Sequence, residues 1–110
     1  MWGRKTVSKA WELRKNEVLL GIVVTDSHEE YPWIKCAFEA TREFQPYWQL
    51  FAEEARLLIE GQNGNGQQQL TLYQQEIKEM GLSLVQFGKP KTIENFILHI
   101  QGRQARLRIG

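Results

Sequence analysis

The spacing of apolar residues changes twice along the chain, and this change constrains the fold more than any other feature. Apolar residues alternate with polar ones up to about residue 40, take the spacing of an amphipathic helix between 46 and 80, and alternate again from 82 onward. The strand patterns therefore form two runs around a helical block and do not alternate with helices. This order predicts an α+β fold in which helices pack on one face of an antiparallel sheet.

Three strands are expected before the helical block, at 10–14, 17–26 and 33–40. The first two form a hairpin, because Asn16 lies between them and asparagine tolerates the positive φ of a tight turn. Gly21 interrupts the second strand. A glycine at such a position indicates a bulge or a close approach of another part of the chain.

The helical block is predicted as a hairpin of two helices, at 46–60 and 67–80. A glycine- and glutamine-rich linker covers about 61–69, and Gly81 is suited to end the second helix in the left-handed conformation. Each helix carries one apolar stripe, made of Tyr47, Phe51, Ala55 and Leu58 in the first and of Leu70, Tyr73, Ile77 and Met80 in the second.

Strand patterns return at 82–87, 93–101 and 105–109. The expected architecture is thus a single domain over 1–110, with a sheet of about six strands in the order βββ-αα-βββ. A chain of 110 residues can bury about two thirds of the surface that it exposes when unfolded, so its core requires neither a metal nor a disulfide.

The composition indicates the cellular compartment in which the protein is expected to work. Cys36 is the only cysteine and its neighbours are apolar, which favours a buried thiol in a reducing compartment. No apolar run approaches the ~20 residues of a membrane span, and the first residues do not resemble a secretory signal. We therefore expect a cytoplasmic protein of bacterial type. The net charge of +1 provides no overall attraction for nucleic acid or for an anionic membrane.

Three short motifs carry a resemblance. They are Pro32-Trp33 at the start of a strand, Phe51-Ala52-Glu53-Glu54 in a helix, and Leu98-His99-Ile100-Gln101-Gly102 in a hairpin. In these motifs the chain resembles a family of short, uncharacterised bacterial proteins. It departs from that pattern by a longer acidic stretch before Pro32 and by the glutamine-rich linker. The resemblance implies one intact domain, and because the family has no assigned activity it implies no catalytic residue.

The loop before Pro32 holds an acidic cluster with one histidine, made of Asp26, His28, Glu29 and Glu30. Carboxylates and imidazole can ligate a divalent cation or exchange protons. However, neighbouring loop residues point in different directions, and the spacing does not match a calcium-binding loop. These features favour a solvated loop, and no metal site is predicted.

The C-terminal hairpin carries a basic strip made of His99, Arg103, Arg106 and Arg108. If the last two strands pair around Gly102, then His99 lies opposite residue 105 or 106 and shares a face with Arg106. Such a strip can hold a phosphate, a carboxylate or an RNA backbone. The alternative is a solvated basic face that protects an edge strand from aggregation.

Tyr31 and Trp33 flank Pro32 at the junction of a loop and a strand. Aromatic residues at such a place can form an exposed anchor for a partner, although packing in the core explains most aromatic residues of this chain.

Three functions remain open. The leading hypothesis is a non-catalytic module that binds another protein through Tyr31, Trp33 and the loop 26–30, since no set of nucleophile, base and orienting group stands out. The second is a small binder of nucleic acid or of an anionic ligand that uses the basic C-terminal strand. The third is a small enzyme in which His99 acts with a carboxylate from the loop 26–30. No cofactor is predicted, and a homodimer stays open.

Overall fold

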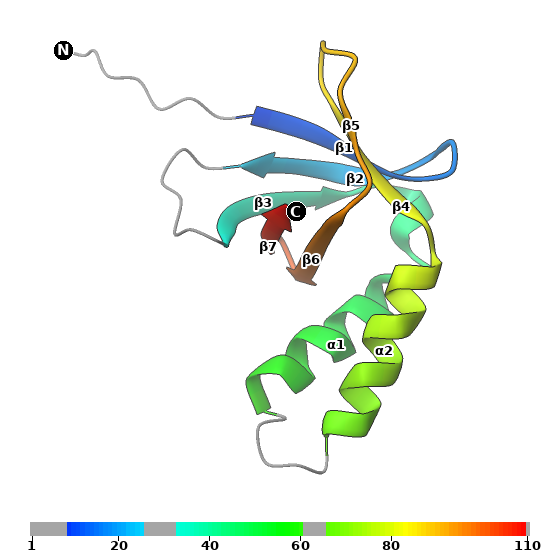
Figure 1. Ribbon diagram of the computed structural model, residues 1–110, viewed down its shortest axis with the longest axis vertical. Coiled ribbons are helices and arrows are strands. Elements are labelled where there is room, and N and C mark those ends of the chain that lie inside the picture. The colour runs from blue at the N-terminus through cyan, green and yellow to red at the C-terminus, as the bar shows by residue number, and fades with distance from the viewer. Residues whose placement is uncertain (1–8, 26–32, 61–65, 110) are drawn as a thin grey trace, which may run out of the picture.

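In chain order two groups of strands flank a pair of helices, as the change of spacing predicts, and the helices project from one end of the sheet (Figure 1). The computed structural model describes residues 9–25, 33–60 and 66–109. Its elements in chain order are the strands β1 (Lys9–Lys15), β2 (Val18–Thr25) and β3 (Ile34–Ala40), the 3-10 helix η1 (Arg42–Phe44), the helices α1 (Trp48–Glu60) and α2 (Gln67–Glu79), and the strands β4 (Leu82–Gln86), β5 (Thr92–Ile93), β6 (Phe96–Gln101) and β7 (Gln104–Ile109). The α+β class is confirmed.

The strands of the described residues form one antiparallel sheet in the order β5-β4-β1-β2-β3-β7-β6. β5 and β6 stand at opposite ends of this order, yet only Glu94 and Asn95 separate them in the chain. Two residues reach no further than about 10 Å. The two ends of the sheet must therefore lie near each other, and the sheet curls, as the continuous path from β4 through β5 to β6 illustrates (Figure 1).

The same observation explains why the sheet has seven strands. The segment 93–101, expected as one strand, is divided into β5 and β6 because its two parts pair with different partners: Ile93 lies opposite Leu84 in β4, and Phe96 lies opposite Ile109 in β7. The consecutive polar residues Glu94 and Asn95 interrupt the apolar alternation at this division.

The β1–β2 hairpin follows the predicted turn and contains a bulge. Asn16 has a φ of 59°. Leu13 pairs with Gly21 and Arg14 pairs with Leu19, so Leu20 is an extra residue on β2. This bulge allows Leu20 and Val23, which strict alternation would place on opposite faces, both to be buried.

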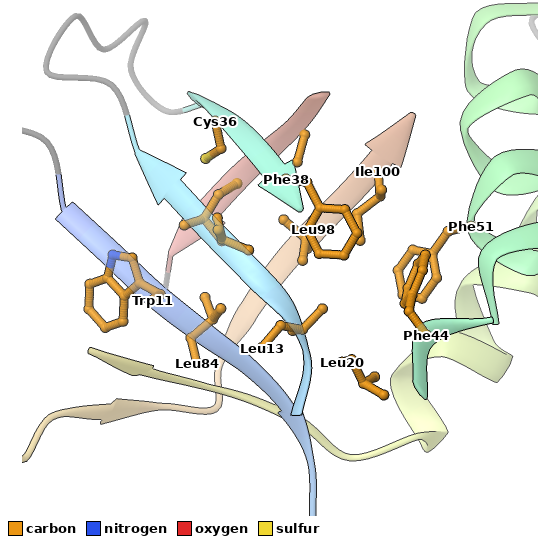
Figure 2. Close-up of a cluster of buried hydrophobic side chains, with 13 residues drawn as sticks. Trp11, Leu13, Leu20, Cys36, Phe38, Phe44, Phe51, Leu84, Leu98 and Ile100 are labelled. Atoms are coloured by element: carbon orange, nitrogen blue, oxygen red, sulfur yellow. The ribbon is translucent and has the colours of Figure 1, made fainter. Parts of the chain in front are cut away.

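Aromatic side chains join the helical block to the sheet. The ring centroids of Phe38 in β3 and Phe44 in η1 are 5.0 Å apart, and those of Phe44 and Phe51 in α1 are 5.5 Å apart. Figure 2 shows Phe44 and Phe51 beside the apolar side chains of the sheet. Further on, α1 packs against both α2 and β6. This contact places one side of α1 close to the C-terminal hairpin.

The apolar stripe predicted for α2 agrees with this packing, and the stripe predicted for α1 agrees in part, because Leu57 is buried where Leu58 was expected. Phe51 and Ala55 are buried in α1 and Leu70 is buried in α2. The second helix ends at Gly81, whose φ of 69° is the predicted left-handed conformation. Within residues 9–25, 33–60 and 66–109, neither helix is long and apolar enough to cross a membrane.

The thiol of Cys36 is buried, and we predict that it resists alkylation in the folded protein. Burial raises its pKa to about 11 from an ordinary value of 9.0. At pH 8 this shift lowers the thiolate fraction roughly 100-fold. Iodoacetamide should therefore label Cys36 rapidly in denaturant and at least tenfold more slowly in buffer, as followed by mass spectrometry. Equal rates in the two conditions would show that the thiol is accessible.

Candidate functional site

The C-terminal hairpin aligns basic side chains in one row across three strands. Gly102 forms the turn with a φ of 65°, and His99 of β6 lies opposite Arg106 of β7, as predicted. Arg106 in turn lies opposite Lys35 of β3. Side chains of directly opposed residues share a face and are close neighbours. His99, Arg106 and Lys35 are named here the basic row.

The basic row lies in an open groove of about 950 Å³. Arg103 also lines the groove, whereas Arg108 is not among its lining residues. Three of the four basic residues predicted from the sequence are thus brought together. No residue that lines the groove within the described part of the chain is acidic. The groove therefore concentrates positive charge in a protein whose net charge is only +1.

Helix α1 supplies an apolar wall to the same groove through Ala55, Leu58 and Ile59. The charged residues Glu53, Arg56 and Glu60 of α1 pair with one another and do not line the groove. Arg56 contacts Glu53 at 2.6 Å and Glu60 at 3.0 Å. The groove is therefore basic on the hairpin and apolar on the helix.

A buried carboxylate holds His99 in place. Glu54 of α1 is 1% exposed, and its Oε2 lies 2.8 Å from His99 Nδ1. Gln74 Nε2 of α2 donates a second hydrogen bond to Glu54 Oε2 at 3.1 Å. A carboxylate only accepts hydrogen bonds, so Nδ1 of His99 carries the proton in this contact. The imidazole orientation is thereby fixed, and Nε2 is the ring nitrogen that remains for a ligand.

Trp33 packs against the imidazole, and Arg108 lies near Trp33. The ring centroids of Trp33 and His99 are 5.1 Å apart with a tilt of 32°. The guanidinium carbon of Arg108 lies 5.9 Å from the Trp33 centroid, within the range of a cation–π contact. Arg108 therefore lies over Trp33, and Trp33 itself is half-buried at the edge of the groove.

Two residues of the site were not predicted, and one of them left a signal. Glu54 follows Phe51 by three positions and precedes Ala55, so it belongs to the buried side of α1. A carboxylate on an apolar stripe requires a partner, and the partner is His99. Lys35 left no comparable signal, because its role depends on the pairing of β3 with β7, which are far apart in the sequence.

Five further candidate residues were predicted from the sequence. Asp26, His28, Glu29, Glu30 and Tyr31 lie outside the described residues. Among the residues that the structure does describe, no group of three or more histidine, cysteine, aspartate or glutamate side chains is arranged to hold a metal ion. The carboxylate that His99 contacts is Glu54, which belongs to α1 and not to the loop 26–30.

Comparison with protein-family models, with curated proteins and with solved structures found no match to this chain.

Proposed function

We propose that the protein is a non-catalytic binder of an anionic ligand, which it holds in the groove between α1 and the C-terminal hairpin. The observation that carries the proposal is the basic row together with Arg103, in a groove whose described lining contains no carboxylate. Lys35, Arg103 and Arg106 bring three formal positive charges to one open space. A concave surface lined by charge of one sign focuses its field and raises the local concentration of oppositely charged ligands.

Each member of the row contributes a different kind of contact. Arg106 stands between Lys35 and His99, and its planar guanidinium can bind a phosphate or a carboxylate through two parallel hydrogen bonds. Lys35 adds a point charge beside it. His99 has its ring orientation held by Glu54, and when both ring nitrogens are protonated it donates a hydrogen bond from Nε2–H to the anion without a large loss of side-chain entropy.

The two other hypotheses from the sequence stay predictions. The protein-interaction module depends on Tyr31 and on the loop 26–30, which lie outside the described residues. The enzyme hypothesis requires His99 to act with a carboxylate of that loop. We also propose the bacterial cytoplasm as the place of action, a proposal supported by the single, unpaired Cys36.

Calorimetric titration with inorganic pyrophosphate at low ionic strength tests the proposal. Pyrophosphate should bind the unmodified protein, and Arg106→Gln should weaken binding about 10- to 100-fold, because a hydrogen bond between charged groups contributes about 1.5–3 kcal/mol. The affinity should also fall as salt is added.

Arg42→Gln is the matched control. Arg42 is an exposed arginine of η1 that does not line the groove, and the substitution removes the same charge. Its affinity for pyrophosphate should stay within about twofold of the unmodified protein, since exposed charges at a distance are screened. Equal losses in the two variants, or no binding to begin with, would refute the assignment of the groove.

A further inference from the structure

We infer that the ligand of the groove is an amphipathic anion, with its charged group on the basic row and an apolar group against α1. This inference rests on the proposed function and adds a chemical class to it. The groove has two unlike walls: the hairpin offers His99, Arg103 and Arg106, and the helix offers Ala55, Leu58 and Ile59. A ligand that contacted only the basic hairpin would leave the apolar side chains of the helix exposed to water.

The size of the groove supports the same conclusion. Its volume of about 950 Å³ lies at the upper end of the range of about 300–1,000 Å³ that is usual for small-molecule sites. A simple inorganic anion would occupy a minor part of this space. An anion that carries an alkyl or aryl group would extend from the row towards the helix.

Two side chains of the apolar wall, Leu58 and Ile59, are not buried in the core. Ile59 is 65% exposed and Leu58 is half-buried. A single exposed apolar side chain is common on protein surfaces and requires no explanation. What distinguishes Ile59 from Leu72, an exposed apolar residue of α2 at 61%, is its position in the groove beside the cationic groups.

The positive charges of the groove indicate which kind of ligand it binds. The positive groups of the groove disfavour a purely apolar partner, because covering them would remove their hydration without replacing it. The charged pairs of α1, Arg56 with Glu53 and with Glu60, are already satisfied on the helix. The expected ligand is therefore a small molecule with one anionic group and one apolar group.

A series of n-alkyl phosphates tests the inference, at concentrations below those at which they form micelles. The dissociation constants of inorganic phosphate, butyl phosphate and octyl phosphate are measured by calorimetry, with octyl glucoside as an uncharged alkyl control. A fully buried methylene strengthens binding about fourfold. In an open groove we expect about twofold per methylene, so octyl phosphate should bind at least tenfold more tightly than butyl phosphate.

Substitutions on each wall of the groove measure the contribution of that wall to binding. Ile59→Ser should reduce the gain from butyl to octyl phosphate at least threefold and leave the affinity for inorganic phosphate unchanged. Leu72→Ser is the matched control on α2 and should change neither value. Arg106→Gln should weaken all the phosphates and leave octyl glucoside unaffected.

The outcomes distinguish this inference from the proposed function. If all three phosphates bind with equal affinity, the inference is refuted and the anion-binding function stands. If octyl glucoside binds as tightly as octyl phosphate, the charged group is irrelevant and the inference is again refuted. If none of the phosphates binds, the proposed function itself fails. An affinity that falls as protein concentration rises would indicate that a second copy of the chain occupies the groove, which also overturns the inference.

Discussion

Phe51→Ala is expected to lower the free energy of unfolding by about 3–5 kcal/mol, the range found when a buried phenylalanine is truncated. Phe51 is 0% exposed and is the α1 member of the aromatic series that continues through Phe44 to Phe38. Its removal would leave a cavity between the helical block and the sheet. Because a domain of this size is stabilised by about 5–15 kcal/mol in total, this loss is a large share of its stability.

Denaturation by urea, followed by circular dichroism, measures this effect. Ile59→Ala serves as a control on the same helix, because Ile59 is 65% exposed, and an exposed substitution should change stability by less than about 0.5 kcal/mol. Similar midpoints for the two variants would mean that α1 does not pack on the sheet through Phe51.

Gly21→Ala should destabilise the protein by about 3 kcal/mol, near the upper end of the usual cost of overpacking. A Cβ at this position would lie 2.5 and 2.6 Å from two atoms of the Phe38 ring and 2.8 Å from the carbonyl oxygen of Glu39. Phe38 is 3% exposed, so its ring has little room to move. The backbone of β3 or β2 would have to shift.

Two further variants test the cause of this loss by the same urea denaturation. Gly102→Asn places a side chain in open space at a left-handed turn position, which asparagine tolerates, and should cost less than about 1 kcal/mol. Gly21→Ala combined with Phe38→Leu should cost less than the sum of the single variants, because the shorter side chain relieves part of the clash. Strict additivity would contradict the close contact of Gly21 with the ring.

The parts of the fold that depend on neighbouring residues could be predicted from the sequence. Asn16 at the turn of the first hairpin and Gly81 at the end of α2 both have the expected positive φ. The facing of His99 and Arg106 followed from the position of Gly102 alone. In each case the relevant residues lie within one turn or one hairpin, where chain geometry leaves few alternatives.

The parts that depend on distant pairing could not be predicted. The division between β5 and β6 reflects which strands they meet: β5 pairs with β4 and β6 pairs with β7. Lys35 enters the basic row only because β3 pairs with β7. The sequence order of strands does not determine which strands become neighbours when the connections are long.

The candidate site could be predicted from the sequence only in part. The basic hairpin was visible as a pattern, but the groove exists only because α1 packs beside β6. The pairing of Glu54 with His99 is the clearest consequence of that packing. A buried acid on a helix indicates that a partner is required and does not identify it.

The most direct test of the account is a titration of the 15N-labelled protein with pyrophosphate, followed by two-dimensional NMR. The account predicts that the amide signals of Lys35, His99 and Arg106 shift together and saturate with one affinity. The signals of Lys89 and Lys91, which lie in the turn between β4 and β5 and do not line the groove, should remain in place. Shifts centred on those lysines, or shifts spread evenly over all exposed basic residues, would contradict the claim that the groove is the binding site.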